Sequence, residues 1–259
     1  MLRTVTAIRY VTPLREGGSM PALVEADDDG LYVVKLRGAG QGPPVLVAEL
    51  IAAELARVAG LMVPDVVGVE VDQALGRNEP DSEVRGLLMA SGGLNLGLDF
   101  LPGSVTYDPA ADPAPDALLA STLVLFDAFV TNPDRTPKNP NLLTWQRRLW
   151  LIDHGAALYF QYAWNAEAPL AGARTAFARI KDHVLLPLAS RLGDAAKALQ
   201  SAWTAEKIAA ITVDIPDSWL VSDHAVLPTR EQYAAWLQTR LEALPHIAEE
   251  AARVRASLV

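Results

Sequence analysis

Apolar and polar residues alternate along the first third of the chain in the manner of β-strands. Residues 6–14 alternate, residues 21–26 form a short β-capable run, and the turn DDDG leads into a further strand over residues 31–36. Strand-like patterns return at residues 64–72 and 83–90. This part of the chain therefore predicts a small sheet.

One helix interrupts these strands. Residues 45–60, VLVAELIAAELARVAG, carry apolar side chains at helical spacing. The helix is expected to end at Gly60, with Pro64 following soon after it. A loop rich in proline, aspartate and alanine over residues 106–116 then separates this region from the rest of the chain.

The remaining residues are predicted to be mainly helical. The expected helices cover residues 116–132, 173–192, 194–203, 205–213 and 230–257. A short hairpin is predicted among them at residues 141–155. The pattern as a whole predicts an α+β fold with a small β-rich N-lobe (residues 1–105) that contains one helix, and a helical C-lobe (residues 106–259). A cleft between two such lobes is a usual place for a small ligand.

Composition removes several classes of function. The chain has 259 residues, 51% of them hydrophobic, and a formal net charge of −9. An acidic protein is a poor nucleic-acid binder, because such binding needs a basic face. There is no cysteine, which excludes disulfides and Cys-ligated zinc. No signal peptide or membrane-spanning run is evident, so we expect a cytoplasmic protein with no membrane partner.

The chemistry concentrates in residues 132–141, NPDRTPKNPN, which we call the proline-rich loop. Asp134 precedes Asn139 by five positions, and the apolar segment after the loop ends in Asp153, with a glycine two residues later. Kinases use this order: an aspartate that orients the attacking hydroxyl and accepts its proton, then an asparagine and a second aspartate that hold Mg²⁺. The prolines would hold Asp134 and Asn139 in a fixed relation.

Each of these residues also has a plainer interpretation. Asp134 alone could be a turn residue, and Asn141 competes with Asn139 for the amide role. Asp153 could simply end a strand. The combined spacing favours the catalytic interpretation of Asp134, Asn139 and Asp153, with the last two as metal ligands. Asp127, in the apolar run before the loop, is interpreted as a structural brace for it.

Candidate nucleotide-binding residues lie upstream. Lys35 follows four apolar or aromatic residues in LYVVKL, so it would rise from a buried strand toward phosphates. A glycine turn one strand earlier, with Gly17, Gly18 and Ser19, would let backbone N–H groups approach those phosphates. Met89 and Ser91 end the last strand expected in the N-lobe, which makes them candidates for the adenine-contacting hinge.

These elements together resemble the HipA-like kinase family, in a short single-module form related to protein kinase-like and phosphoinositide kinase-like folds. The matching segments are TPLREGGSMPALVEADDDGLYVVKL, VAELIAAELARVAGLMVPD, FDAFVTNPDRTPKNPNLLTWQRRLWLIDHG, RIKDHVLLPLA and IPDSWL. The resemblance implies a bilobal kinase that uses ATP and Mg²⁺, with a protein Ser/Thr hydroxyl as one possible acceptor. It favours Glu49 as the partner of Lys35, whereas a helical wheel places Glu54 on the apolar face.

The sequence differs from the toxin members of this family. Its kinase-like pattern begins within the first dozen residues, its glycine turn is EGGSMP, and the proline-rich loop reads DRT where the toxins have Asp-Asn-His. These differences weaken the case for an antitoxin partner. The alternatives are a small-molecule kinase, a nucleotide-binding pseudokinase that acts as a regulatory module, and a non-catalytic helical interaction module.

Overall fold

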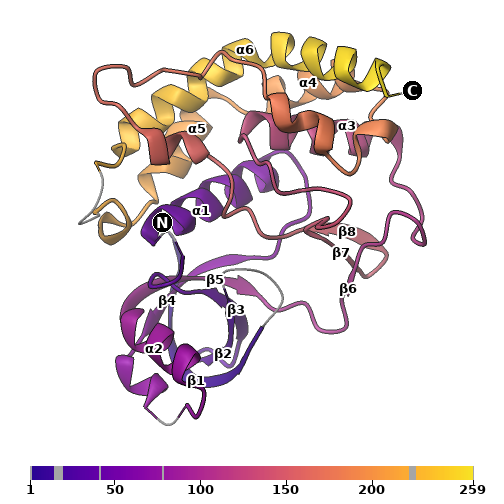
Figure 1. Ribbon diagram of the computed structural model, residues 1–259. Helices are drawn as coiled ribbons and strands as arrows, with labels where there is room; N and C mark the ends of the chain where they lie inside the picture. Colours follow the sequence, from indigo (N-terminus) through magenta and orange to yellow (C-terminus); the bar gives the residue numbers. More distant parts are fainter. Residues whose placement is uncertain (1, 15–19, 41, 78, 222–225, 259) are drawn as a thin grey trace.

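The computed structural model describes residues 2–14, 20–40, 42–77, 79–221 and 226–258. Figure 1 shows a closed barrel of strands at one end of the molecule and a group of helices at the other. We call these the barrel part and the helical part. None of the helices among the described residues is both long enough and apolar enough to cross a membrane.

Five strands close the barrel. They are β1 (Thr4–Pro13), β2 (Ala22–Ala26), β3 (Leu31–Lys35), β4 (Val66–Val71) and β5 (Gly93–Asp99). The order is β1-β2-β3-β5-β4, and β1 closes the ring by pairing in parallel with β4. Alternate side chains fill its interior, with Val24, Val34 and Val69 almost completely buried. Gly97 of β5 is required there, because a Cβ at this position would lie 2.6 Å from Val69 Cγ2.

The chain between β4 and β5 corrects one expectation. Residues 83–90 were expected to form a strand, but they lie in the helix α2 (Ser82–Ala90), which follows the short 3₁₀ helix η1 (Gln73–Gly76). Asp81 caps α2 by accepting hydrogen bonds from the backbone N–H groups of the next turn, and Val84 and Leu88 bury one face of the helix. The barrel part therefore has a further helix, and its last strand is β5.

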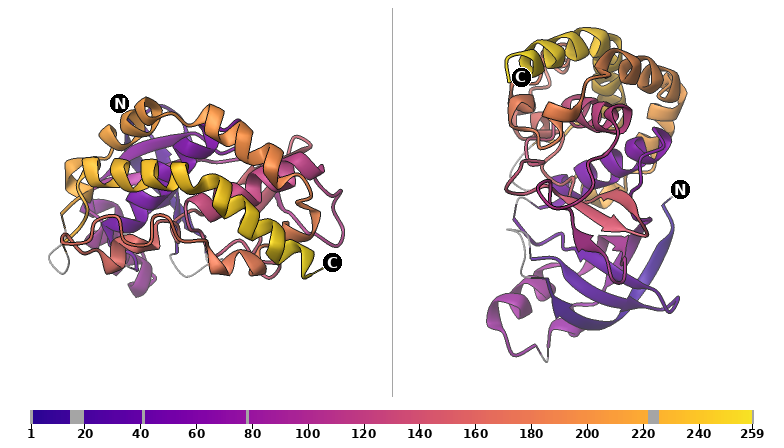
Figure 2. Two further views of the ribbon diagram at one scale, coloured as in Figure 1. Left: turned by 90° about the horizontal axis from the view of Figure 1, so that it is seen from above. Right: turned by 90° about the vertical axis from the view of Figure 1, so that its right-hand side faces the viewer.

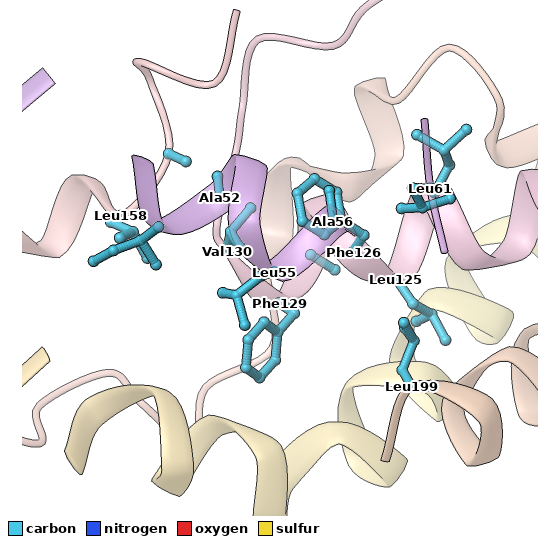
Figure 3. Packing of buried hydrophobic residues seen from close by; sticks show 14 of the residues in the cluster. Ala52, Leu55, Ala56, Leu61, Leu125, Phe126, Phe129, Val130, Leu158 and Leu199 are labelled. Atoms are coloured by element: carbon cyan, nitrogen blue, oxygen red, sulfur yellow. The ribbon is translucent and has the colours of Figure 1, made fainter. Parts of the chain in front are cut away.

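Helix α1 (Pro43–Val58) connects the two parts. It starts with two prolines after Gly42, which has a φ of 77°. Its apolar side chains belong to the core of the helical part, and Figure 3 shows Leu55 and Ala56 beside Phe126 and Phe129. Although α1 is inserted between strands of the barrel, its packing is mainly against helices.

Besides α1, the described residues of the helical part contain four α-helices and a small sheet. The helices are α3 (Ala117–Phe129), α4 (Leu192–Ala202), α5 (Ala205–Val213) and α6 (Arg230–Ala256). The sheet contains β6 (Val105–Thr106), β7 (Leu142–Trp145) and β8 (Arg148–Leu151). Helix α6 spans the outer side of this part, as the two views in Figure 2 show. The predicted hairpin is confirmed as β7 and β8, and the expected division at residue 105 falls inside β6.

The helix expected over residues 173–192 is wrong. This stretch instead contains the short 3₁₀ helices η3 (Ala178–Asp182) and η4 (Leu186–Leu188); two others are η2 (Tyr159–Ala163) and η5 (Asp217–Trp219). Tertiary contacts draw the backbone away from a helical path. The guanidinium of Arg240 donates hydrogen bonds to the backbone carbonyl oxygens of Gly172, Ala173 and Thr175. In addition, Pro187 has no backbone N–H to donate within a helix.

Candidate active site

A cavity of about 1050 Å³ lies where the barrel part faces the helical part. Its lining includes residues from the end of β1, the end of β3, the end of β5 and the chain after it, the proline-rich loop and the chain after β8. Lys35, Asp134, Asn139 and Asp153 all contribute to this lining. The fold thus brings together four residues that are spread over more than a hundred positions in the sequence.

The proline-rich loop is fixed at its start by the end of α3. The backbone N–H of Asn132 donates to the carbonyl of Asp127, and the Asn132 side chain accepts from the backbone N–H of Asp134 at 3.1 Å. Asp134 Oδ2 accepts hydrogen bonds from Asn139 Nδ2 at 3.1 Å and Asn141 Nδ2 at 3.3 Å. Both asparagines considered from the sequence therefore contact Asp134, and Oδ1 of that aspartate has no hydrogen bond within the described residues.

A buried ionic network holds the proline-rich loop on its buried side. Arg135 is 1% exposed and donates to Asp127 Oδ2 at 2.5 Å. Asp127 also accepts from Asn132 Nδ2 at 3.0 Å and from His183 Nε2 at 2.9 Å. His183 Nδ1 accepts from the backbone N–H of Leu185, so the ring proton is on Nε2. Burial alone would raise the pKa of Asp127, but the Arg135 charge and the His183 hydrogen bond hold it well below its usual range.

This network gives places to residues that the sequence left without a role. The charge of Arg135 points inward and does not line the cavity, and His183 holds the carboxylate that binds Arg135. The contacts agree with Asp127 as a brace. A pairing of Asp127 with Arg135 could have been suspected from the sequence, because a buried carboxylate needs a partner and an arginine follows eight residues later.

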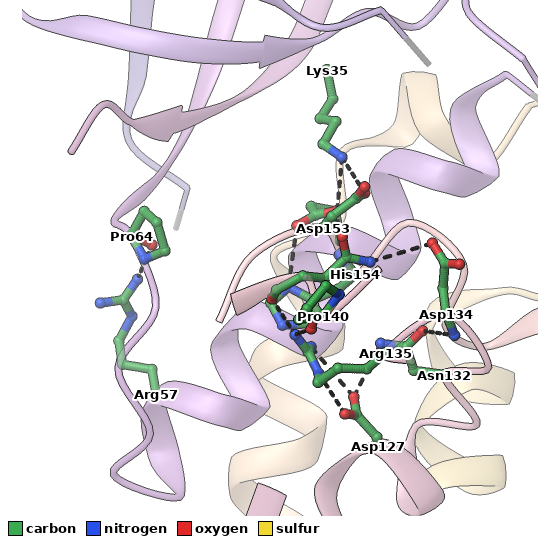
Figure 4. A network of polar contacts seen from close by, with 12 residues as sticks. Lys35, Arg57, Pro64, Asp127, Asn132, Asp134, Arg135, Pro140, Asp153 and His154 are labelled. Carbon is green, nitrogen blue, oxygen red and sulfur yellow. Dashed lines mark hydrogen bonds and ion pairs between the residues drawn. The ribbon is translucent and has the colours of Figure 1, made fainter. Parts of the chain in front are cut away.

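The second polar cluster joins β3, α1 and the chain after β8, as Figure 4 shows in part. Lys35 Nζ forms an ion pair with Asp153 Oδ1 and lies 3.7 Å from Glu49 Oε2. Burial alone would lower the pKa of Lys35, but the charges of Glu49 and Asp153 raise it. Burial would likewise raise the pKa of Glu49, but Lys35 and hydrogen bonds from His154 lower it to about 2. Both side chains are thus charged at neutral pH.

The positions of Glu49 and Glu54 show which of the two glutamates is the partner of Lys35. Glu54 lies 3.5 Å from Arg57 on the same helix, and its side chain is 32% exposed. Glu49 is fully buried and faces Lys35. His154, which no sequence pattern marks as functional, contacts Glu49: its backbone N–H donates to Glu49 Oε2 at 2.9 Å and its Nδ1 lies 3.1 Å from Glu49 Oε1.

The remaining expected nucleotide contacts have different outcomes. Gly17, Gly18 and Ser19 lie outside the described residues. Met89 lies in α2 and is 48% exposed, while the buried Ser91 donates to Leu87 O and accepts from Gly38 N. Both residues lie at the end of α2, so their expected place at the end of the last barrel strand is wrong. Neither of them lines the cavity.

That place is taken by residues 99–101, the last residue of β5 and the two that follow it, which line the cavity. The sequence signal was a short strand, GLNLGLD, whose glycines hid its β-pattern.

A divalent cation is compatible with the donor atoms in the cavity. Asp153 offers a carboxylate, and its side chain is 37% exposed. Asn139 uses Nδ2 to reach Asp134, which leaves its amide oxygen available. Hard cations such as Mg²⁺ take oxygen ligands of these two kinds, completed by phosphate and water. Asp153 adopts a left-handed backbone conformation with a φ of 56°, which is uncommon for a residue other than glycine.

Known kinases share this arrangement of the chain. A Helicobacter pylori proinflammatory kinase, CtkA, is similar in structure with a TM-score of 0.61 at 12% identity, over the whole of both chains. A Golgi casein kinase with Mn and ADP bound has a TM-score of 0.50 at 13% identity, over 96% of this chain and 73% of the other. These likenesses show a protein kinase fold that mixes sheet and helix. No curated protein sequence matches the chain. The family model for HipA-like kinases matches residues 7–247, and the chain therefore belongs to the HipA-like kinase family.

Proposed function

We propose that this protein transfers the γ-phosphoryl group of ATP to a hydroxyl group, with Mg²⁺ as the metal. The observation that carries the proposal is the convergence of Lys35, Asp134, Asn139 and Asp153 on one cavity. Family membership supports a kinase, and a Golgi casein kinase of the same fold has Mn and ADP bound. In this proposal the barrel part and the helical part are the two lobes, with ATP between them.

The contacts suggest a role for each side chain. Asp134 has one oxygen held by Asn139 and Asn141, so its free Oδ1 would orient the acceptor hydroxyl and receive its proton. Lys35, kept charged by Glu49 and Asp153, would bind the phosphates. Asp153 and Asn139 would hold Mg²⁺, which neutralises the charge of the phosphate oxygens.

The end of β5 and the chain that follows it form the proposed adenine contact. Residues 99–101 line the cavity beside Val33 and Leu98, which provide an apolar surface for a planar base. The backbone N–H of Leu101 has no hydrogen bond within the described residues, and it would suit a ring nitrogen acceptor. This assignment replaces Met89 and Ser91.

A protein Ser/Thr hydroxyl is the acceptor that we propose. The support comes from the family and from the name of a structural neighbour, casein kinase, because casein is a protein. The two neighbours resemble this chain in fold alone, so a small-molecule hydroxyl is the alternative outcome of the test.

Transfer of radiolabelled phosphate from ATP in a cell lysate tests the proposal. The wild type is compared with Asp134→Asn and with Asp29→Asn, a control at an exposed turn with a φ of 62° that asparagine tolerates. We expect labelled protein with the wild type and the control, and a loss of about 10²- to 10⁴-fold with Asp134→Asn, as for removal of a general base. Label only in small molecules would favour the alternative. A wild type that binds Mg·ATP but labels nothing above the Asp134→Asn level would contradict kinase activity.

A further inference from the structure

His154 connects the buried glutamate of α1 to the proposed metal ligand. It follows Asp153 directly in the sequence, and it contacts both carboxylate oxygens of Glu49. The backbone N–H of His154 donates a hydrogen bond to Glu49 Oε2, and its ring Nδ1 forms a hydrogen bond with Glu49 Oε1. Glu49 Oε2 also faces Lys35 Nζ, which in turn contacts Asp153. Glu49, His154, Asp153 and Lys35 thus form a closed ring across β3, α1 and the chain after β8, in which a peptide bond joins Asp153 to His154. Figure 4 shows Lys35, Asp153 and His154 of this ring.

The atoms define the tautomer of His154. A carboxylate only accepts hydrogen bonds, and the pKa of Glu49 is lowered, so Nδ1 must carry the proton that points to Glu49 Oε1. The other nitrogen, Nε2, is buried and has no hydrogen-bond partner within the described residues. The ring itself packs edge-on against Phe126 of α3, with centroids 5.8 Å apart. His154 thus has two separable properties, a donor at Nδ1 and a ring that fills space.

The donor restricts the rotation of the Glu49 carboxylate. With Oε1 held by the imidazole and Oε2 by the backbone N–H, the carboxylate presents Oε2 to Lys35 in one orientation. The same backbone N–H belongs to the peptide group that joins Asp153 to His154. Asp153 itself has a φ of 56°. Glu49 therefore also helps to hold Asp153 in a backbone conformation that costs free energy.

We infer that His154 is a positioning residue for phosphoryl transfer, and that its Nδ1–H donor, through Glu49, orients Lys35 and Asp153. This inference rests on the proposed function for its kinetic consequence. It assigns a role in the reaction to a residue that is 1% exposed and does not line the cavity. A residue that merely filled the core would be replaceable by any side chain of similar size.

Two substitutions separate the donor from the ring. His154→Asn places an amide N–H where Nδ1 lies and removes the ring. His154→Phe keeps a ring against Phe126 and removes the donor. We expect His154→Asn to keep kcat within about threefold of the wild type. We expect His154→Phe to lower kcat by about 10- to 100-fold, the factor for losing one hydrogen bond to a charged group, with the KM for ATP changing less. Equal losses in both variants, or an active His154→Phe, would overturn the inference.

Two further measurements do not depend on transfer activity. In the wild type, nitrogen NMR of the His154 ring should show a protonated Nδ1, and an unprotonated Nδ1 would overturn the inference. Hydrogen exchange at the backbone amide of residue 154 should be at least about tenfold faster in His154→Phe than in the wild type and in His154→Asn. An unchanged rate in His154→Phe would count against the inference. Failure of the proposed function would look different, as a wild type that transfers no phosphate while these two results hold.

Discussion

Asp134 and Arg135 are neighbours in the sequence, yet their side chains serve opposite sides of the proline-rich loop. Asp134 lines the cavity, whereas Arg135 is buried and bound to Asp127. A loop that carries a buried guanidinium is fixed on its inner side, because releasing that charge from its carboxylate is costly. The buried ion pair therefore gives Asp134 a firm support, and its effect on activity is indirect.

The Asp127 carboxylate predicts a loss of stability in acid. Its pKa is lowered in the folded protein, and that of Glu49 is lowered to about 2. A group whose pKa is depressed by folding stabilises the protein above its unfolded pKa, and this stabilisation is lost as pH falls toward the folded pKa. The free energy of unfolding should therefore decrease from about pH 5 to pH 2.

Urea unfolding at several pH values tests this expectation with Asp127→Asn. At pH 7 this variant should be destabilised by about 3 to 5 kcal/mol, because Arg135 is left buried without its partner. Its free energy of unfolding should also decrease less steeply with falling pH than that of the wild type. A variant that is as stable as the wild type at pH 7 would contradict the role of Asp127 as a brace.

Lys35 and Glu49 predict a coupling that can be measured. Lys35→Met should weaken ATP binding and destabilise the protein by about 3 kcal/mol, because Glu49 stays buried without its cation. The double variant Lys35→Met/Glu49→Gln should recover part of that stability, since the fully buried carboxylate charge of Glu49 is removed and only the partly exposed Asp153 is left without the lysine. Calorimetric ATP titration and urea unfolding of the single and double variants supply the measurements. Asp134→Ala, as the control, should bind ATP almost as well as the wild type, and unchanged binding by Lys35→Met would place Lys35 outside the ATP site.

The elements that were predicted correctly have local causes. Strands β1 to β4, helix α1 and the β7–β8 hairpin follow from alternation, helical spacing and turn residues within each segment. The errors occurred where contacts between segments decide the outcome. Residues 173–192 have a helical pattern, but Arg240 donates hydrogen bonds to two of their backbone carbonyls, those of Ala173 and Thr175. In α2 the local signal for a helix is the cap at Asp81, and Gly86 weakens the helical pattern that follows it.

Alanine substitutions at one glycine in α2 and one in β5 should have opposite effects on stability. Gly86 lies inside α2, and a Cβ added there would meet no atom within 4 Å. Gly86→Ala should therefore stabilise the protein by about 0.5 to 1 kcal/mol, the difference in helix propensity. Gly97→Ala should destabilise it, because the new Cβ would clash with Val69. Urea unfolding of both variants is the measurement, and a destabilising Gly86→Ala would argue against the helix.

At the scale of the whole molecule, the site depends on how the barrel part and the helical part face each other. The spacing within the proline-rich loop made Asp134 and Asn139 predictable, and the glycine after Asp153 marked the second carboxylate. The support of these residues was predictable only in part. Asp127 was interpreted as a brace from the sequence, but its partner His183 lies 56 positions away and His154 lies 105 positions from Glu49, so the roles of the two histidines appear only when the helices have packed.

Binding of ATP between the two parts should stabilise the molecule as a whole, and the metal should be necessary for most of this effect. A ligand at 100 times its Kd adds about 2.7 kcal/mol to the free energy of unfolding, and this raises Tm. Asp153→Asn should remove the part that depends on Mg²⁺, because an amide cannot supply the carboxylate charge to a hard cation. Asn139→Ala should reduce it less. Thermal unfolding with ATP and Mg²⁺, with ATP and EDTA, and with no ligand gives the comparison for each variant. Since Asp153 also pairs with Lys35, the shifts are compared with the ligand-free Tm of the same variant. Equal stabilisation of the wild type by ATP in EDTA and in Mg²⁺ would show that Asp153 and Asn139 do not bind metal with the nucleotide.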